Sequence, residues 1–316
     1  MRPELQKKID FAIRLLKSVG EMYDGTIEIA YSGGKDSDVI LQLAKEAGIK
    51  YQAIYKNTTI DPPGTIKHAQ DMGAKIIQPK QTFFELVAQR GYPNRLRRFC
   101  CEVIKEYKIH DKLVMGVRKA ESRKRAERYK EPTECRLYNK KTEHVEAIYP
   151  ILEWTDQDVA EFIADRGIKC APVYYDEKGK FHVERRLGCM GCPLAYKKKR
   201  IAEFQAHPGL VKAYLRAGRK YMESHPDSEL KHKYGDEYAY FYRNLYCTSE
   251  QEFNHVATGL FGKPDFKGFW EKTFGISLSP SSNPSKRNNM EIDKIYNMDC
   301  LEGMKNIPDG SIDESK

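Results

Sequence analysis

The sequence of 316 residues has no apolar run that approaches the length of a membrane span, so we expect no contact with a membrane. Its opening residues, MRPELQKKID, contain no apolar signal core, and we therefore expect a cytoplasmic protein. The spacing G-x-x-x-x-G-K-[ST] is absent, which excludes a phosphate site of the Walker type. Four histidines after residue 200 lack metal-ligand spacing: His207, His225, His232 and His255.

What is present fits a globular chain with an anionic ligand. Charged residues make up 31% and hydrophobic residues 40%, which is typical of a soluble domain. The net charge of +9 suits a nucleotide, a sulfate ester or a nucleic acid, without selecting among them. Eight cysteines in a cytoplasmic chain indicate metal binding or catalysis rather than disulfides.

The stretch from Thr26 to Leu43 has the pattern of an anion site. A short β-branched run precedes the hexamer Ser32–Ser37 (SGGKDS), and an apolar-periodic helix is expected from about Asp38 to Gly48. Gly33 and Gly34 allow a tight turn whose N–H groups approach a phosphate. Lys35, two serine hydroxyls and the helix dipole add to the attraction.

The chain from residue 4 to residue 166 alternates helical and strand patterns. This alternation predicts the α/β class, with a parallel sheet, helices on both faces and ligands at the carboxyl ends of the strands. Residues 127–146 are polar and are expected to form a loop. The expected strands are 26–29, 51–55, 75–78, 112–117 and 146–154, and the expected helices are 4–19, 38–48, 66–72, 82–90 and 155–166.

Basic residues follow the expected strand 112–117. At this position in an α/β sheet they would face a bound ligand. We expect Arg118 and Arg125 to contact an anion. Lys119, Arg123 and Lys124 are better explained as solvated side chains of a basic loop.

Four cysteines fall into two pairs, Cys100–Cys101 and the C-x-x-C of Cys189 and Cys192. Four thiolates could hold tetrahedral zinc or a [4Fe–4S] cluster, and C-x-x-C alone could be a redox dithiol. Adjacent side chains diverge, so the vicinal pair favours a cluster with separated iron corners. Cys135 has no partner spacing and is expected to be a simple thiol.

The C-terminal half has a different composition. Residues 195–220 are expected to be helical and basic, and residues 221–278 to be a small helical portion with an aromatic core. The resulting boundaries are a first domain at 1–200, a helical portion at 201–278, a linker at 279–291 and a tail at 292–316.

The order of these motifs resembles the phosphoadenylyl-sulfate (PAPS) reductase family of the PP-loop ATP pyrophosphatase superfamily, over roughly residues 25–200. The pieces are SGGKDS, Cys-Cys, Gly-Val-Arg-x-x-Glu-Ser, Ile-Leu-Glu-Trp-Thr-x-x-Asp-Val, Pro-Val-Tyr and Gly-Cys-x-x-Cys-Pro. The cysteine pattern resembles the [4Fe–4S] subset, which includes adenylyl-sulfate reductases and the sulfurtransferase of DNA phosphorothioation systems. The resemblance implies phosphate or sulfate binding by Ser32, Gly33, Gly34, Lys35, Asp36 and Ser37. It implies a nucleotide site completed by Gly116, Arg118, Glu121, Ser122 and Arg125, and a cluster on Cys100, Cys101, Cys189 and Cys192.

Within this resemblance three functions stay open. An enzyme could use ATP or an adenylated sulfonucleotide for nucleotidyl or sulfur transfer, with Mg²⁺, for which Asp36 is a candidate ligand, and with a sulfur donor protein. A reductase would need an external thiol or reductant protein, because the family's terminal Glu-Cys-Gly segment is absent and Pro62–Thr65 lacks a glutamate seen in many relatives. The third possibility is a nucleotide- or DNA-binding sensor without turnover.

The tail gives a separate indication. Residues 295–313, IYNMDCLEGMKNIPDGSID, resemble the opening of an amino-group DNA methyltransferase, in which Asp299 would lie near the methyl donor. No Asp-Pro-Pro-Tyr motif follows, so we expect a truncated fusion or a chain cut short; a fusion would have had a DNA-modifying domain as its partner. This expectation makes DNA, or a DNA-modification protein, a candidate partner.

Overall fold

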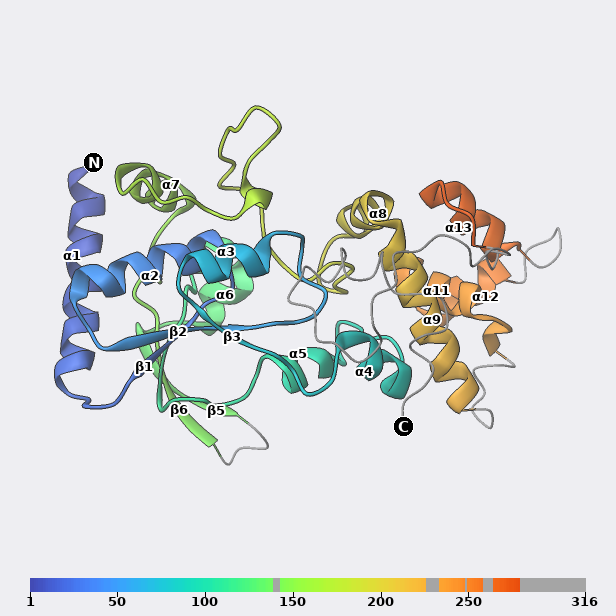
Figure 1. The fold of residues 1–316 in the computed structure, drawn as a ribbon, viewed down its shortest axis with the longest axis horizontal. Helices are drawn as coiled ribbons and strands as arrows, with labels where there is room; N and C mark the ends of the chain where they lie inside the picture. Colours follow the sequence, from blue (N-terminus) through green and yellow to red (C-terminus); the bar gives the residue numbers. More distant parts are fainter. Residues whose placement is uncertain (139–142, 226–232, 248, 258–263, 279–316) are drawn as a thin grey trace, which may run out of the picture. The chain divides into compact units, whose positions relative to one another are not determined.

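The computed structural model describes residues 1–138, 143–225, 233–247, 249–257 and 264–278. Its contacts form two compact units (Figure 1). The first unit contains residues 1–79 and 101–188, and the second contains residues 80–100 and the chain from 189 onward. The sequence-based boundary at residue 200 stays a prediction. The linker expected at 279–291 and the tail expected at 292–316 lie outside the described residues.

The first unit is built on a six-stranded sheet in the order β3-β2-β1-β4-β6-β5. All neighbouring strands are parallel except β5, which is antiparallel to β6. This mostly parallel sheet with helices around it confirms the α/β class. The strands are β1 (Ile27–Ala30), β2 (Tyr51–Lys56), β3 (Lys75–Ile77), β4 (Lys112–Val114), β5 (Thr133–Tyr138) and β6 (Glu143–Ile148).

The strand order reverses between β1 and β4. The chain moves outward from β1 to β2 and β3, and then returns to the other side of β1. Loops that leave the carboxyl ends of two such strands diverge and open a crevice, which is where open α/β sheets bind ligands. The turn at Ser32–Ser37 follows β1, and Gly116 and Arg118 follow β4. The fold therefore brings these two sequence motifs to the same edge of the sheet.

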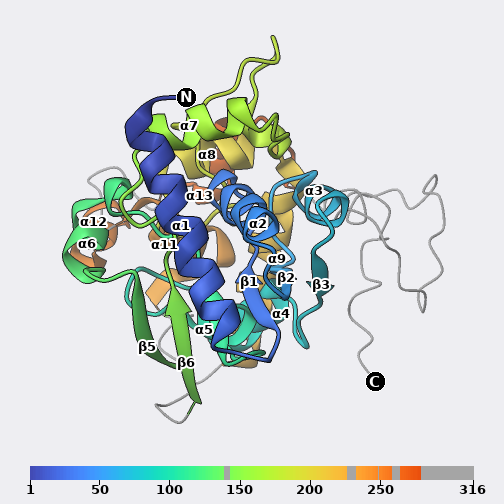
Figure 2. The same cartoon turned by 90° about the vertical axis from the view of Figure 1, so that its left-hand side faces the viewer.

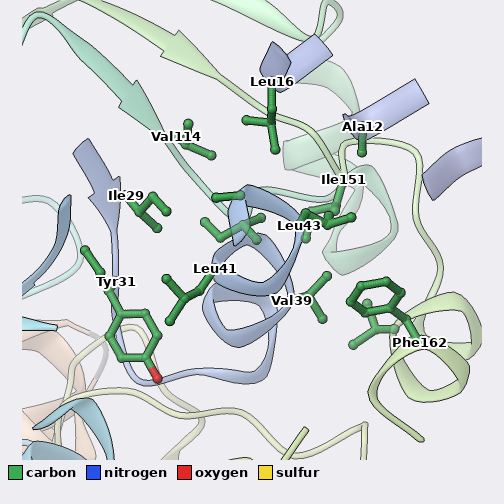
Figure 3. Packing of buried hydrophobic residues seen from close by; sticks show 14 of the residues in the cluster. Ala12, Leu16, Ile29, Tyr31, Val39, Leu41, Leu43, Val114, Ile151 and Phe162 are labelled. Atoms are coloured by element: carbon green, nitrogen blue, oxygen red, sulfur yellow. The ribbon is translucent and has the colours of Figure 1, made fainter. Parts of the chain in front are cut away.

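Helices pack on the face of the sheet to which the odd-numbered residues of β1 point. Ile27 and Ile29 are buried there against Leu16 of α1 and Leu41 of α2, and Phe162 of α7 extends the same core (Figure 3). Figure 2 looks onto α1, which lies beside α2. The helices of this unit are α1 (Pro3–Glu21), α2 (Lys35–Ala47), α3 (Thr65–Asp71), α6 (Arg123–Arg128) and α7 (Asp156–Asp165), with single turns of 3-10 helix at Lys119–Glu121 and Pro172–Tyr174.

The opposite face of the sheet carries a buried ion pair. Glu28 of β1 is 2% exposed, and its Oε1 lies 3.4 Å from Nζ of Lys56 in β2. Lys56 also donates a hydrogen bond of 2.7 Å to the carbonyl of Tyr107, in the segment that follows α5 (Phe99–Ile104). Burial lowers the pKa of Lys56, and the Glu28 carboxylate opposes that change.

Two sequence expectations in this unit were wrong. Within the described residues of 127–146, the chain forms the end of α6, the strand β5 and the first part of β6, which pairs antiparallel with β5, rather than a loop. The polar composition hid β5 because an edge strand that is not covered on both faces can carry charged side chains such as Glu134 and Arg136. The strand expected at 146–154 ends at Ile148, and the buried apolar residues after it lie in turns closed by Leu152 N–H to Tyr149 and Trp154 N–H to Ile151. An apolar run alone does not distinguish a strand from buried turns.

The second unit is helical in its described part. Its helices are α4 (Phe83–Arg90), α8 (Lys197–Ala206), α9 (Pro208–Ser224), α11 (Glu237–Tyr246), α12 (Glu250–Ala257) and α13 (Phe266–Phe274). α9 packs on α4, α8 and α11, and α11 packs on α13. The helical stretch expected from 195 to 220 is divided because Pro208 begins a new helix. Aromatic rings in mutual contact fill its centre: Tyr92, Phe204, Tyr214, Phe241 and Trp270.

Across the ranges that the structure describes, the helices are all too short or too polar to span a bilayer.

Candidate functional site

The turn between β1 and α2 depends on two glycines. Gly33 has φ of +73°, and a Cβ there would lie 2.8 Å from Cγ2 of Thr65. Gly34 is the N-cap residue of α2, and within the described chain no side chain caps this helix end. A Cβ on Gly34 would lie 3.3 Å from the hydroxyls of Ser32 and Tyr174. The turn therefore presents backbone at a helix N-terminus that larger residues would obstruct.

α2 begins at Lys35, three residues earlier than the sequence pattern predicts. Lys35, Asp36 and Ser37 thus belong to the first helical turn. Ser37 Oγ donates a hydrogen bond of 2.6 Å to the carbonyl of Gly34, and the Gly34 N–H lies 3.4 Å from Ser32 Oγ. The two serine hydroxyls hold the glycine turn against the helix.

Lys35 is a buried cation in this turn. Its side chain is 5% exposed, and its Nζ lies 3.3 Å from Asp36 Oδ2 and 5.5 Å from the ring centroid of Tyr174. Burial raises the pKa of the Tyr174 phenol, so Tyr174 stays neutral and Asp36 is the anion paired with Lys35. A buried cation beside a helix N-terminus attracts anions more strongly than an exposed one, because water screens it less.

Arg118 links three segments of the first unit. Its side chain is 1% exposed, its Nε donates to Asp36 Oδ1 at 2.7 Å, and its Nη2 donates to Asp156 Oδ1 at 2.7 Å. Its Nη1 donates to the Trp154 carbonyl at 3.3 Å. Asp36 therefore has one oxygen paired with Arg118 and the other near Lys35. Arg118 and Asp36 hold the turn in place. Because each Asp36 oxygen lies near a cation, neither is left over to coordinate a metal ion in this arrangement.

Gly116 allows the β4 loop to approach the turn closely. A Cβ on Gly116 would lie 3.0 Å from the backbone carbonyl carbon and oxygen of Asp36. Backbone atoms cannot yield as a flexible side chain can, so this position favours glycine. The close approach explains why a glycine precedes Arg118 by two residues.

The residues after Arg118 form a small network. Glu121 accepts hydrogen bonds from the Arg118 N–H at 3.3 Å and from Arg125 Nη1. Ser122 caps α6 by accepting from the Arg125 N–H at 3.2 Å. The Arg125 side chain is 41% exposed, so it is the more accessible of the two arginines expected to meet an anion. The loop places Arg118 as an internal anchor and Arg125 at the surface.

A buried polar cluster that the sequence does not predict lies beneath the turn. Asp38 is fully buried, and its Oδ1 accepts from the Tyr31 hydroxyl and lies 3.0 Å from His68 Nε2. Burial raises the pKa of Tyr31, and the nearby Asp38 carboxylate raises it further. The cluster joins the end of β1, the first turns of α2 and helix α3. The only sequence signal is an aspartate at a position where the helical stripe would place an apolar residue.

The loop from β2 to α3 lies against the glycine turn through Thr65. Thr59 in this loop has φ of +64°, which is rare for a β-branched residue. Asp61 stabilises the loop by accepting from the Tyr55 hydroxyl at 2.5 Å and from the Thr58 N–H at 3.1 Å. Strained backbone that its surroundings hold in place is common at functional sites.

The C-x-x-C turn belongs to the second unit and is held by buried polar groups. The Cys192 N–H donates to the Cys189 carbonyl at 3.3 Å, and the Gly191 N–H donates to Glu203 Oε2 at 2.9 Å. Tyr214 donates its hydroxyl hydrogen to the Met190 carbonyl at 3.1 Å. Gly191 has φ of +71°, and a Cβ there would lie 2.6 Å from the Tyr214 oxygen. Tyr214 and Glu203 thus fix the shape of this turn.

Three of the four predicted cysteine ligands gather near Tyr214. Burial raises the pKa of Tyr214 most, and the thiolates of Cys189, Cys192 and Cys100 raise it further. All three thiols are half-buried and belong to the second unit. Cys101 is grouped with the first unit, and its place in the set rests on its adjacency to Cys100. Over the described residues, no three Cys, His, Asp or Glu side chains converge in the manner of a site for a single metal ion.

Comparison with protein families matches residues 26–195 to the Phosphoadenosine phosphosulfate reductase domain. The match covers more than half of the chain and spans both the glycine turn and the C-x-x-C turn. The chain belongs to this family. The family assignment confirms the coarse resemblance, while its [4Fe–4S] subset and the methyltransferase-like tail stay predictions.

Curated relatives of this reductase-domain protein occur in Methanocaldococcus jannaschii. The chain is 29% identical over 230 residues to the uncharacterized protein MJ0066, covering 68% of this chain and 46% of that protein. It is 26% identical over 229 residues to the uncharacterized protein MJ0973, covering 67% of this chain and 52% of that protein. The chain therefore spans about half the length of the curated relatives it matches.

Solved structures give more distant matches. A phosphoadenylyl-sulfate reductase from Candida auris, in a phosphate complex, aligns at 13% identity and a TM-score of 0.40, covering 60% of this chain and 96% of that chain. An FMN adenylyltransferase from Candida glabrata, in complex with FMN and the ATP analog AMPCPP, aligns at 13% identity and a TM-score of 0.39, covering 54% of this chain and 60% of that chain.

Proposed function

We propose that this protein binds ATP or an adenylated sulfonucleotide at the turn Ser32–Ser37 and transfers a nucleotidyl group or sulfur to an acceptor. The observation that carries the proposal is the glycine turn at the N-terminus of α2, uncapped within the described chain, with the buried cation of Lys35 beside it. This turn lies where the strand order reverses, at the carboxyl end of β1. Membership in the reductase-domain family supports a nucleotide as the anion.

The residues of the turn divide into two roles. Backbone N–H groups of Gly33 and Gly34, the hydroxyls of Ser32 and Ser37, and the ammonium of Lys35 bind phosphate or sulfate and stabilise the charge that develops as a bond to it breaks. Gly116, Asp36 and Arg118 position the turn rather than touch the nucleotide. Glu121 and Ser122 orient Arg125, which supplies the accessible cation. Mg²⁺ that accompanies ATP is then held mainly by phosphate oxygens, because Asp36 is paired with Arg118.

We further propose that Cys100, Cys101, Cys189 and Cys192 hold a [4Fe–4S] cluster. Three of these thiols, Cys100, Cys189 and Cys192, lie near enough to Tyr214 to raise its pKa. The vicinal pair Cys100–Cys101 supports a cluster, whose irons occupy separate corners, over tetrahedral zinc, because adjacent side chains diverge. A bound cluster would supply electrons or sulfur, or orient an anionic substrate.

A reductase that uses an external thiol or a reductant protein is the second candidate. Cys247, on the C-terminal side of the C-x-x-C turn, is 8% exposed, and burial raises the pKa of its thiol. Such a thiol is a poor nucleophile. Cys247 therefore does not supply the nucleophile, and the reductase candidate relies on an external thiol. A nucleotide- or DNA-binding sensor without turnover is the third candidate, and the methyltransferase-like tail supports DNA or a DNA-modification protein as a partner.

The first experiment separates these functions by their products. The protein is purified without oxygen and given ATP with Mg²⁺, or adenylyl sulfate with a thiol. Pyrophosphate release from ATP supports transfer chemistry, whereas sulfite release supports the reductase. Lys35→Ala should weaken nucleotide binding about tenfold or more, because the variant cannot make a charge-assisted hydrogen bond to phosphate. Lys67→Ala is the matched control, since Lys67 is 77% exposed and pairs with Asp71 on its own helix.

The cysteine proposal is tested on the same preparation. About four irons and four acid-labile sulfides per chain are expected. Both should be lost in Cys189→Ser and retained in Cys135→Ser, whose thiol is exposed on β5. One zinc without sulfide would reject the cluster and leave the nucleotide proposal intact.

A further inference from the structure

We propose that a surface of the second unit, formed by residues 94–98 and 193–198, binds a single-stranded polynucleotide. We call it the basic loop surface. The inference rests on the proposed function, whose acceptor class it names. The inference uses only residues outside the nucleotide turn, so an experiment can reject it without rejecting the proposed function, and the reverse.

Hydrogen bonds give the basic loop surface a defined shape. Arg95 Nε donates to the Pro193 carbonyl at 3.3 Å, which joins its two segments. Asn94 Oδ1 accepts from the N–H groups of Leu96 and Arg97, at 2.9 and 2.8 Å. These bonds form a compact turn that directs the following side chains outward, and residues 94–98 are all exposed. The segment is ordered by its own hydrogen bonds.

The charge of this surface has a single sign. Residues 91–100 and 189–202 contain no aspartate or glutamate, whereas Arg95, Arg97, Arg98, Lys197 and Lys198 are all exposed. The lysines occupy the first turn of α8, which has no acidic residue. Cations at a helix N-terminus are disfavoured by the helix dipole. Lys197 contacts the Tyr246 ring, 4.0 Å from its centroid, and donates to the Tyr246 carbonyl at 3.2 Å. Helix stability does not account for Lys198, and an anionic partner does.

Exposed apolar side chains lie among these cations. Leu96 is 95% exposed, Leu194 is 51% exposed and Tyr196 is 83% exposed. A surface that needed only to be soluble would not combine these side chains with a row of arginines and lysines. Cations that follow a phosphate backbone, combined with an exposed aromatic ring on which a base stacks, are the means by which proteins bind single strands. A duplex keeps its bases stacked on each other and would leave Tyr196 without a function.

The basic loop surface is close to three of the cysteines in the sequence. Residues 94–98 closely precede Cys100, and residues 193–198 directly follow Cys192. A strand that contacts both segments would therefore run beside the thiols of the second unit. A polynucleotide strand is therefore the acceptor class that we name for the proposed transfer.

The test measures binding of the full chain to a fluorescein-labelled single strand of about 12 nucleotides by anisotropy, at about 0.1 M salt. Arg97→Glu/Lys198→Glu should weaken binding more than tenfold and reduce the slope of log affinity against log salt by about 0.7 for each phosphate that the variant no longer neutralises. Lys7→Glu/Lys17→Glu makes the same change in net charge on exposed positions of α1, and should alter affinity less than twofold. Thermal unfolding checks that each variant is folded.

The stacking part has its own pair of variants. Tyr196→Ala should weaken binding about tenfold, because stacking on an aromatic ring contributes on the order of one to three kcal/mol per base. Phe11→Ala, at a 46% exposed position of α1, should have no effect. Tyr196→Phe should retain the affinity, since the ring and not the hydroxyl is used.

Several results would overturn the inference. An equal weakening in the α1 charge variant would mean that only net charge matters. Equally tight binding of a duplex of the same length, or a Tyr196→Ala variant with unchanged affinity, would remove the role of stacking. Displacement of the strand by poly-aspartate at the same charge concentration would point to an acidic protein instead. Nucleotide binding measured in the same variants should be unchanged, so a chain that binds ATP but no strand would reject this inference alone.

Discussion

Replacing Arg118 by methionine should destabilise the first unit more than any change at the surface of the site. Arg118 is 1% exposed and pairs with Asp36, which is 17% exposed, and with Asp156, which is 54% exposed. The methionine fills much of the volume but leaves Asp36 Oδ1 without its partner, while Asp36 Oδ2 keeps Lys35 Nζ at 3.3 Å. Breaking a buried pair from one side costs about 3–5 kcal/mol, and the partial exposure of Asp36 places the expected cost near the lower end, about 3 kcal/mol. A unit of this size would lose about 6–12 °C in Tm.

The two ion pairs of Arg118, with Asp36 and with Asp156, should differ in their contributions to the free energy of unfolding. Asp156→Asn removes the pair that reaches solvent and should cost about 1 kcal/mol or less, since exposed ion pairs contribute little. Urea unfolding followed by tryptophan fluorescence measures both variants. The chain has two tryptophans, so a Trp270→Phe background leaves Trp154, in the first unit, as the only one.

The outcome that would refute this reasoning is a small effect of the arginine itself. If Arg118→Met costs less than about 1 kcal/mol, or no more than Asp156→Asn, the pairing with Asp36 does not hold the turn and Arg118 is available to a ligand. Nucleotide then should raise the Tm of the wild type but not of Arg118→Met. The same experiment therefore decides between the positioning role and direct anion contact.

Three further predictions concern other parts of the chain. Burial alone would raise the pKa of Asp158, but hydrogen bonds from Lys8 and Thr155 outweigh it and hold this pKa at about 2. Because the folded pKa of Asp158 is depressed, its stabilisation is present near neutrality and is lost as pH falls from about 4 towards 2. Over that pH range, urea unfolding should show that the wild type loses about 2 kcal/mol of unfolding free energy and that Asp158→Asn does not. Thr59→Gly removes the strain of a left-handed backbone and should raise the free energy of unfolding by about 1 kcal/mol. The same variant should bind nucleotide more weakly, and calorimetry can measure both effects. A decrease in stability would contradict the strain. Tyr214→Phe leaves the Met190 carbonyl without its donor and should lower the free energy of unfolding of the second unit by about 1–2 kcal/mol, measured by Trp270 fluorescence. An unchanged unfolding midpoint would mean that the C-x-x-C turn holds its shape without the hydroxyl.

The parts of the site that the sequence could predict are those whose residues are close together in the chain. The glycine turn, its strand and its helix form one continuous stretch, and turn residues between two periodic segments identify it. The pairing of Arg118 with Asp36 joins residues 82 positions apart, and nothing in either segment specifies it. The sequence predicts that Arg118 meets an anion, and this stays a prediction; the structure adds the pairing of its guanidinium with Asp36 and Asp156.

The buried cluster of Tyr31, Asp38 and His68 shows a second limit. Asp38 alone interrupts an apolar pattern, and only the fold shows that Tyr31 and His68 meet it. The edge strand β5 was missed for the opposite reason. Its composition resembles a loop because it needs only the backbone of β6 for its hydrogen bonds.

The division of the second unit between two distant segments has a consequence for biosynthesis. α4 packs on α9, which the ribosome makes only after the whole sheet and α8 have been synthesised. Until α9 has been synthesised, the buried apolar side chains of α4 cannot pack against it: Phe83, Leu86 and Val87. The nascent chain must shield them from water in another way, or this unit must fold later. The first unit has its whole sheet by Ile148, so it can fold while the second is incomplete. Cys100 is likewise synthesised long before Cys189 and Cys192, so any loading of these thiols must follow completion of the chain beyond them rather than accompany the folding of the sheet.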